Sequence, residues 1–194
     1  MPTITIEPAA AGRFDDAEHA LTGGGGGASC QCQWWMLRNR DFDETTREQR
    51  TDMLRAEFDR APAPGLIAYV DGEAAAWVRV GPRTAQQRLA RTRVFAASPE
   101  PWEDDSVWAV TCFVIHRDHR GLGLTAPLLD AAVAHARESG ARLVEACPID
   151  TAVTRTPVND LFVGVLASFL AAGFHEVARP RPDRAIVAYD LAGS

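Results

Sequence analysis

Apolar residues along the second half of the chain form runs that are separated by polar turns. The run Val107–Ile115 predicts a buried strand, and apolar residues at helical spacing from Leu124 to Ala136 predict a helix that ends near Gly140. A second apolar run, Leu143–Cys147, predicts another strand. A strand, a helix and a strand in immediate succession favour a right-handed crossover, so we expect these two strands to be parallel neighbours.

Shorter apolar segments before this unit predict antiparallel strands. Thr3–Ile6 predicts a first strand, and Phe14–Leu21 predicts a short helix. Leu66–Val70 and Ala74–Val80 lie on either side of Asp71-Gly72, a dipeptide that tolerates the positive φ angles of a tight two-residue turn. We therefore expect a hairpin here.

End signals predict two further helices. Residues 45–48 (TTRE) have the spacing of a capping box, with Thr45 as the cap and Glu48 three residues later, and apolar residues follow at helical spacing up to Ala61. Leu161–Ala172 predicts a second helix, which Gly173 stops.

The last two strands are predicted at Phe174–Ala178 and Ala185–Leu191. Together the elements predict an α/β fold: a mixed, mostly antiparallel sheet flanked by helices, with a parallel β-α-β unit at its centre. The 194 residues suffice for one sizeable core, so we expect a single domain over residues 1–194.

Composition narrows the classes of partner and compartment. The formal net charge of -6 does not indicate a general affinity for nucleic acid or for an anionic membrane. The first residues lack the pattern of a signal peptide, and no apolar run approaches the ~18 residues of a membrane span. We therefore expect a cytoplasmic protein that does not bind membranes, with its four cysteines as thiols.

Five consecutive glycines, Gly23–Gly27, follow the first predicted helix. Glycine has no local conformational preference strong enough to fix such a run, so it predicts a mobile segment. Two interpretations stay open, of which the sequence favours the first: a disordered connector, or a lid that closes on a substrate.

The turn between the central strand and its helix, residues 116–124 (HRDHRGLGL), contains Gly121 and Gly123. The first N–H groups of a helix have no partner within the helix, and glycines let a bulky anion approach them, so this turn suits a phosphate. The dinucleotide-binding pattern with three glycines and the phosphate loop ending in Gly-Lys-Ser/Thr are both absent. The alternative is that the glycines only make a sharp turn.

These residues carry a resemblance. Residues 115–124 (IHRDHRGLGL) resemble the acetyl-CoA-binding motif of the GNAT superfamily of N-acetyltransferases, Arg/Gln-x-x-Gly-x-Gly/Ala, which lies between the fourth strand and the following helix. Arg120 and Gly123 match the motif, Thr125 stands in its final small-residue position, and Arg117 replaces a frequent proline. The order of predicted elements matches the family over most of the chain.

The resemblance implies acetyl-CoA as cosubstrate and transfer of its acetyl group to a primary amine by direct attack. The acceptor, a small molecule or a protein amine, is not identified by the sequence. Backbone groups of Phe113 and Ile115 would pair with the pantetheine arm, and a homodimer is common in the family. The backbone N–H groups implied to hold the pyrophosphate belong to Arg120, Gly121, Leu122, Gly123, Leu124, Thr125 and Ala126.

Two positions depart from the family pattern. Phe169 stands where these enzymes often have the tyrosine that protonates the leaving thiolate, and Phe162 stands where they often have asparagine. A phenyl ring has no proton to donate. The alternative function is therefore a catalytically inactive CoA-binding module with a regulatory or interaction role.

Several acidic and imidazole groups are candidates for proton transfer or acceptor binding. Glu145 interrupts an apolar strand, where burial would raise its pKa, and is a candidate catalytic base; an ion pair or an exposed face are the alternatives. The acidic residues 103–105 either attract a cationic acceptor or form a solvated loop. His116 and His119 flank the glycine turn, so we expect surface or phosphate-side roles for them.

The segment 30–35 (CQCQWW) combines two thiols with two indoles. Cys30 and Cys32 could begin a zinc or redox site, but no second close Cys/His pair follows, so we expect no metal. Trp34 and Trp35, with Arg38, are candidate residues of an apolar acceptor pocket, and a place in the core is the alternative for the indoles.

Overall fold

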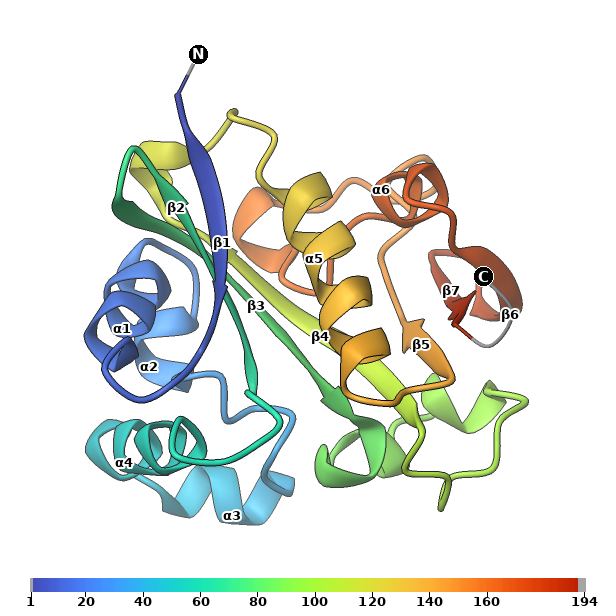
Figure 1. Cartoon of the computed structure of the whole chain (residues 1–194). Coiled ribbons are helices and arrows are strands. Elements are labelled where there is room, and N and C mark those ends of the chain that lie inside the picture. The colour runs from blue at the N-terminus through green and yellow to red at the C-terminus, as the bar shows by residue number, and fades with distance from the viewer. Residues whose placement is uncertain (1, 192–194) are drawn as a thin grey trace.

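One sheet organises the structure, a computed structural model that describes residues 2–191. Within these residues, seven strands follow the order β1-β2-β3-β4-β5-β7-β6, and only β4 and β5 are parallel neighbours (Figure 1). The sheet is therefore mixed and mostly antiparallel, as predicted. The strands are β1 (Ile4–Pro8), β2 (Gly65–Val70), β3 (Glu73–Pro82), β4 (Val107–Ile115), β5 (Leu143–Ala146), β6 (His175–Arg181) and β7 (Arg184–Asp190).

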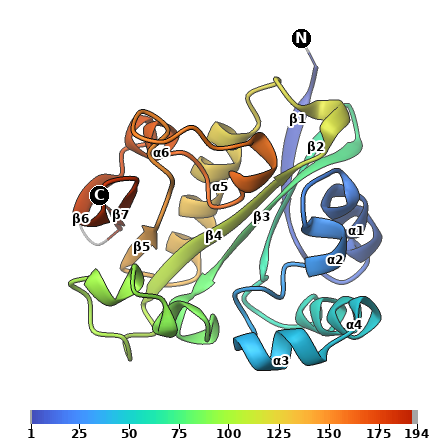
Figure 2. The same ribbon diagram turned by 180° about the vertical axis from the view of Figure 1, so that it is seen from behind.

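Helices cover both faces of this sheet. The longest, α5, lies in front of β4 in Figure 1 and behind it in Figure 2, which shows α1 and α2 on the other side. Alternate residues of β3 divide accordingly, because Val78 packs in the same core cluster as Leu128 whereas Trp77 packs with Phe14. The helices are α1 (Phe14–Thr22), α2 (Gly27–Cys30), α3 (Asn39–Glu44), α4 (Arg47–Glu57), α5 (Thr125–Glu138) and α6 (Leu166–Ala171).

In the part of the chain that the structure describes, five short 3-10 turns connect these elements. Three of them, between β3 and β4, cover the end of the sheet, and a fourth leads into the glycine turn before α5. The turns are η1 (Arg83–Ala85), η2 (Leu89–Arg91), η3 (Phe95–Ala97), η4 (Arg117–His119) and η5 (Val158–Asp160).

The predicted hairpin and crossover are confirmed. Asp71 and Gly72 have φ angles of 51° and 88° and join β2 to β3 as a tight turn. The crossover places Val107 opposite Leu143 in the parallel pair β4 and β5. These local signals were sufficient because turn chemistry and apolar pattern agree.

The capping box of α4 lies one residue later than predicted. Thr46, not Thr45, is the cap: its side chain accepts a hydrogen bond from Gln49 N, and the Gln49 side chain accepts one from Thr46 N. Thr45 donates its hydroxyl to Phe42 O at 2.8 Å instead. Because two adjacent threonines offer the same cap and Gln49 can replace Glu48, the sequence did not distinguish the two registers.

The helix predicted over Leu161–Ala172 is wrong in its first half. Only α6, Leu166–Ala171, is helical, and Gly164 before it has a φ of 81°. The backbone of this segment bonds to the sheet instead, since Phe113 N donates to Phe162 O at 2.6 Å and Ile149 N donates to Gly164 O at 3.0 Å. Tertiary hydrogen bonds to free strand groups override the helical spacing here.

The glycine run is not the disordered connector that the sequence favoured. It forms turns, and α2 begins at Gly27. A Cβ at Gly23 would lie 2.3 Å from His116 Cα, and one at Gly27 would lie 2.4 Å from Leu21 O. Close packing therefore explains the glycines at these two positions. The lid alternative stays a prediction.

Among residues 2–191, no helix has both the length and the apolar character needed to cross a membrane. The single-domain organisation over residues 1–194 stays a prediction.

Candidate active site

A cavity of about 1020 Å³ opens where β4 and β5 separate. It extends from the glycine turn before α5 to a group of aromatic residues that follow α2. Its wall comes from five parts of the chain: residues 21–30, residues 32–42, the end of β4, residues 119–125, and residues 158–168. The cavity thus joins the two regions that the sequence singled out separately.

The separation of β4 from β5 leaves one edge of β4 free of strand partners. Pairing between the two strands stops at Val110 and Ala146. His116 N donates to Ala75 O at 2.8 Å, so, by the alternation of an antiparallel pair, Phe113 and Ile115 direct their backbone groups to the opposite edge. This edge is where the resemblance places the pantetheine arm.

One of the two expected pantetheine partners is already engaged. The N–H of Phe113 donates to the carbonyl of Phe162 at 2.6 Å, so the segment before α6 takes the place that a ligand amide would take. The carbonyl of Ile115 accepts from Arg120 Nε at 3.4 Å. The structure therefore brings Phe113 and Ile115 to the cavity, with Phe162 as an internal competitor that the sequence did not reveal.

The glycine turn offers an open surface of backbone groups. Gly121 and Gly123 have φ angles of 83° and 73°, and a Cβ built on either would meet nothing within 4 Å. Leu124 caps α5 without a side-chain hydrogen bond to the first N–H groups of the helix. The unpaired N–H groups and the open space beside the glycines fit the pyrophosphate of a CoA molecule.

Arg120 and the histidines support this turn. Arg120 Nη2 donates to Asn159 Oδ1 at 3.0 Å, beside Gly24 of the glycine run. His119 lines the cavity, whereas His116 is buried and stacks on His19 with ring centroids 4.8 Å apart. Burial lowers the pKa of His116. A surface role for His116 is therefore wrong, and it supports the turn from the interior.

The aromatic end of the cavity contains both predicted indoles. Trp34 is 39% exposed and contacts Phe42 edge to face, with ring centroids 5.2 Å apart. The guanidinium of Arg88 lies 3.6 Å from the centroid of Trp34 and holds its other side. Trp35 is buried but also lines the cavity, whereas Arg38 does not.

A buried polar cluster beside this end was not predicted. Cys32 Sγ accepts hydrogen bonds from Trp77 Nε1 at 3.2 Å and from Arg79 Nε at 3.3 Å. Arg79 also donates to both carboxylate oxygens of Glu57, at 2.8 and 3.1 Å. Cys32 and Cys112 both line the cavity. A signal did exist in the sequence: Arg79 is the charged residue in the apolar run that became β3.

Two of the cavity cysteines, Cys32 and Cys112, have pKa values that shift in opposite directions. Burial opposes ionisation of Cys32, but a hydrogen bond from Cys112 and the charge of Arg79 outweigh it and lower the pKa of Cys32 to about 6. The hydrogen bond to Cys32 and burial raise the pKa of Cys112 well above its usual value. These two shifts favour ionisation of Cys32 over ionisation of Cys112.

The cysteines of the described residues form neither a disulfide nor a metal site. All four cysteines are free. Within residues 2–191, no group of three or more His, Cys, Asp and Glu side chains is arranged to hold a metal ion.

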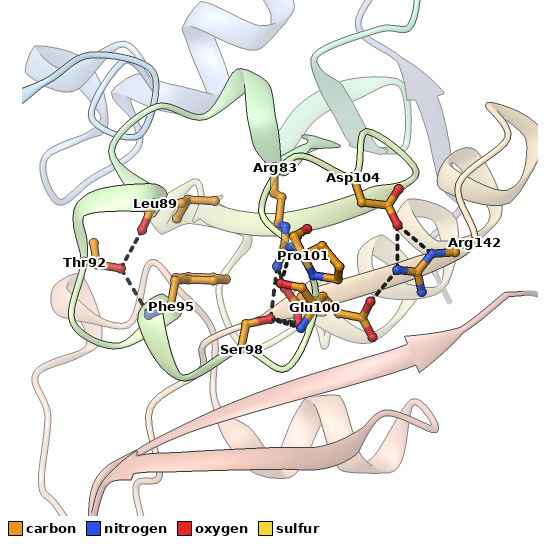
Figure 3. Close-up of polar contacts among 10 residues, drawn as sticks. Arg83, Leu89, Thr92, Phe95, Ser98, Glu100, Pro101, Asp104 and Arg142 are labelled. Carbon is orange, nitrogen blue, oxygen red and sulfur yellow. Dashed lines mark hydrogen bonds and ion pairs between the residues drawn. The ribbon is translucent and has the colours of Figure 1, made fainter.

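Glu145 lies outside the cavity, in a buried ion pair. Its Oε2 accepts from Arg83 Nη1 at 2.7 Å, and its Oε1 accepts from the Ser98 hydroxyl at 2.5 Å. Burial raises the pKa of Glu145, while Ser98 and Arg83 oppose this shift. Figure 3 shows the Arg83 side chain directed toward Ser98, Glu100 and Pro101. The structure therefore supports the ion-pair alternative for this residue.

The acidic segment 103–105 likewise has local partners. Asp104 accepts from Arg142 Nε at 2.9 Å and from Arg142 Nη2 at 2.7 Å, as Figure 3 shows. Hydrogen bonds from Ser106 and then from Arg142 lower the pKa of Asp104 to about 2. Asp105 accepts from the Thr84 hydroxyl at 2.6 Å. None of the three acids lines the described cavity, and Asp104 and Asp105 fasten the loop through these contacts.

Phe169, in the position of the family tyrosine, is fully buried. Its ring packs against Phe113 and Phe174, with ring centroids 6.1 and 5.0 Å away, and does not line the cavity. A Cβ on Gly164 would lie 2.6 Å from the Phe169 ring. This position therefore belongs to the core.

Comparison with known proteins decides the family. A profile of the Acetyltransferase (GNAT) family matches residues 32–162. The chain belongs to this family. It is a GNAT N-acetyltransferase that uses acetyl-CoA as cosubstrate, which confirms the resemblance noted in the sequence.

Solved structures of GNAT proteins share the fold at low sequence identity. The ribosomal-protein-S18-alanine N-acetyltransferase from Escherichia coli is 11% identical, with 99% of this chain and 96% of that chain covered and a TM-score of 0.54. The paia N-acetyltransferase from Thermoplasma acidophilum, solved in complex with coenzyme A, is 11% identical, with 97% and 99% covered and a TM-score of 0.54.

The structure of yncA from Salmonella typhimurium, with its cofactor acetyl-CoA, is 14% identical, with 98% of this chain and 95% of that chain covered and a TM-score of 0.56. No curated protein shows significant sequence similarity to the chain. These identities support the GNAT fold and leave the acceptor open.

Proposed function

We propose that this GNAT acetyltransferase transfers the acetyl group of acetyl-CoA to a primary amine that enters from the aromatic end of the cavity. The observation that carries the proposal is the cavity itself, which joins the glycine turn at Gly121 and Gly123 to the indoles of Trp34 and Trp35. A donor held at one end and an acceptor held at the other would meet beside β4.

Backbone groups bind the donor in this proposal. The N–H groups from Gly121 to Ala126 hold the pyrophosphate, since the N–H of Arg120 already donates to Arg117 O at 3.4 Å. Pro127 contributes none because it has no N–H. The guanidinium of Arg120 lies at the same turn and adds a positive charge. The edge of β4 at Phe113 and Ile115 accepts the pantetheine arm, which requires that Phe162 release the N–H of Phe113.

The positioning of the thioester and the amine accounts for most of the rate enhancement in this proposal. The bound thioester presents an electrophilic carbonyl carbon, and the amine attacks it in the gap between β4 and β5. Phe169 donates no proton, and a thiol with a pKa near ~8.5 is a tolerable leaving group without one. The walls of Trp34, Trp35 and Phe42 align the acceptor.

The lining favours an apolar acceptor. Asp160 is the one carboxylate among the cavity-lining residues described, and its neighbour Asn159 accepts from Arg120 of the glycine turn. A strongly cationic acceptor therefore lacks a carboxylate partner beside the indoles. An amine with an aromatic or aliphatic body fits this end better, whether on a small molecule or on a protein. Cytoplasmic location and homodimerisation stay predictions.

A second candidate is a CoA-binding module without turnover. Two observations favour it: Phe169 replaces the usual acid, and Phe162 occupies the N–H of Phe113. This candidate predicts acetyl-CoA binding with no release of free CoA when amines are supplied.

Calorimetric titration with acetyl-CoA tests the binding step. The variant Gly123→Trp places a bulky side chain in the open turn, and Gly140→Trp is its matched control, since Gly140 lies at the other end of α5 with a φ of 85° and equally open space. We expect micromolar binding by the wild type and by Gly140→Trp, and none by a folded Gly123→Trp.

Turnover is then measured as release of free CoA thiol with a panel of alkyl and aryl amines. Release with any amine, together with its acetylated product, supports transfer and rejects the inactive module. Binding without release across the panel favours the module. Absence of acetyl-CoA binding by the wild type contradicts both.

A further inference from the structure

Direct attack of an amine on acetyl-CoA leaves one buried group without a role. Cys32 is only 2% exposed, yet its side chain lines the same cavity as the glycine turn. Its sulfur is the acceptor for two buried N–H donors, Trp77 Nε1 at 3.2 Å and Arg79 Nε at 3.3 Å. A neutral thiol does not need two donors, whereas a thiolate is stabilised by both.

The position of Arg79 is fixed by its second partner. Glu57 on α4 accepts two hydrogen bonds from the guanidinium, which leaves Nε directed at Cys32. Gln33 also donates to Glu57 at 2.6 Å and ties the chain after Cys32 to the same carboxylate. The cation beside the sulfur is therefore held by three parts of the fold.

Cys112 completes the group from β4. It lines the cavity beside Phe113, the residue whose backbone faces the expected pantetheine arm. Burial opposes ionisation of Cys32, while the neighbouring Cys112 and Arg79 lower the pKa of Cys32. A reactive thiolate thus lies against the strand that would present the thioester.

We propose that Cys32 carries the acetyl group covalently between acetyl-CoA and the acceptor. The thiolate of Cys32 attacks the thioester carbonyl carbon, a new carbon–sulfur bond forms to Cys32, and the bond to the CoA sulfur breaks. The electron pair leaves with the CoA thiolate, which takes a proton from solvent. The amine then attacks the acetylated Cys32, loses its own proton to solvent, and returns the thiolate.

This inference rests on the proposed function, because it needs acetyl-CoA in the same cavity. It also accounts for the missing acid, since exchange between two thioesters needs no proton donor such as a tyrosine. Among the other cavity cysteines, burial raises the pKa of Cys30, and Cys112 is the hydrogen-bond donor of the pair. The geometry therefore selects Cys32.

The test follows acetylation of the protein itself. The full chain is incubated with acetyl-CoA in the absence of any amine, quenched in acid, and analysed by intact mass and by peptide mapping. We expect one acetyl group per chain on the peptide that contains Cys32, removed by neutral hydroxylamine as a thioester is. Acetyl found only on other residues would overturn the proposal.

Cys32→Ala and Cys147→Ala provide matched variants. Both cysteines are buried and free, but Cys147 does not line the cavity. We expect Cys147→Ala to be acetylated like the wild type and Cys32→Ala to lose the hydroxylamine-labile acetyl group while it still binds acetyl-CoA by calorimetry. If Cys32→Ala fails to fold, the wild-type peptide map decides alone.

Calorimetry separates the two ways in which the experiment can fail. Wild-type protein that binds acetyl-CoA but carries no acetyl group on Cys32 overturns the covalent step and leaves direct transfer in place. Wild-type protein that does not bind acetyl-CoA overturns the proposed function as well. A disulfide between Cys32 and Cys112 that persists after treatment with a thiol reductant would also contradict the proposal, since no thiolate would then be present.

Discussion

Two buried arginines, four residues apart in the sequence, have opposite relations to the cavity. Arg79 at the middle of β3 is 3% exposed, and Arg83 in η1 is 0% exposed. Arg83 donates to Glu145 and Ser98 and to the carbonyls of Glu100 and Pro101, and these partners are not among the residues that line the described cavity. Figure 3 shows its contacts with Ser98 and Pro101. Arg79 shares its donors between Glu57 and the sulfur of Cys32.

The difference shows how to distinguish a structural buried charge from a chemical one. The pair of Arg83 and Glu145 compensates its charges with oxygen partners and fastens the loop after β3 to β5. Arg79 is compensated by Glu57 and still directs one donor at a nucleophilic atom on the cavity wall. A charged residue in an apolar strand therefore indicates a chemical role only when the atoms that it contacts are also known.

The largest expected effect comes from breaking the structural pair. Arg83→Met leaves Glu145 as an unpaired buried carboxylate, which should lower the free energy of unfolding by about 3–5 kcal/mol. Urea titration measures this loss. The double variant Arg83→Met/Glu145→Leu should lose less than the single one because no charge stays buried, and a loss equal to or greater than that of the single variant would contradict the ion-pair explanation.

Removing the other arginine should change acidity at the cavity. In the wild type we expect alkylation of Cys32 by iodoacetamide to follow a midpoint near pH 6. Burial raises this pKa, and Cys112 on β4 together with Arg79 and Trp77 on β3 lowers it. Arg79→Met removes the cation, so the midpoint should rise by at least one pH unit and the rate below it should fall about tenfold per unit.

The lowered pKa of Cys32 also determines how the stability of the fold changes with pH. Folding lowers the pKa of Cys32, so its contribution to stability is complete above the pKa of the unfolded thiol and is lost as the pH falls through about 6. Arg137→Met, on the exposed side of α5, is the control and should leave the midpoint unchanged. An unchanged midpoint in Arg79→Met would mean that Arg79 does not set the acidity of Cys32.

The smallest effect on activity is expected at Phe169. Phe169→Tyr restores the family residue, but the ring lies in the core between Phe113 and Phe174 and not at the cavity. We expect kcat to change less than about threefold, because the new hydroxyl does not reach the reacting atoms, and stability to fall by about 1–3 kcal/mol if the hydroxyl stays unpaired. A tenfold rise in kcat would instead show that the position can supply an acid.

Much of the fold followed from the sequence because local and tertiary signals agree. The hairpin at Asp71-Gly72 and the crossover from β4 to β5 each combine a turn signal with an apolar pattern. The glycine turn at Gly121 and Gly123 was recognised for the same reason, since its residues are consecutive. Motifs that are contiguous in the chain are those that a sequence shows most directly.

What the sequence did not show depends on contacts between distant segments. Cys32 meets Arg79 across 47 positions, and Glu145 meets Arg83 across 62. No spacing rule connects such residues, so Glu145 was selected for its charge in a strand and Cys32 was interpreted only as a start of a metal or redox site. The prediction of a helix over Leu161–Ala172 was wrong for the same reason, because the N–H of Phe113 forms a hydrogen bond with the carbonyl of Phe162.

The backbone at Cys32 has a consequence for which residues this position accepts. Gln31 and Cys32 are consecutive non-glycine residues with φ angles of 49° and 53°, in the left-handed region. Each such residue costs about 1–2 kcal/mol of conformational strain, so glycine would be the least strained choice at position 32. The strain of a cysteine at position 32 must therefore be compensated by the contacts that its sulfur makes.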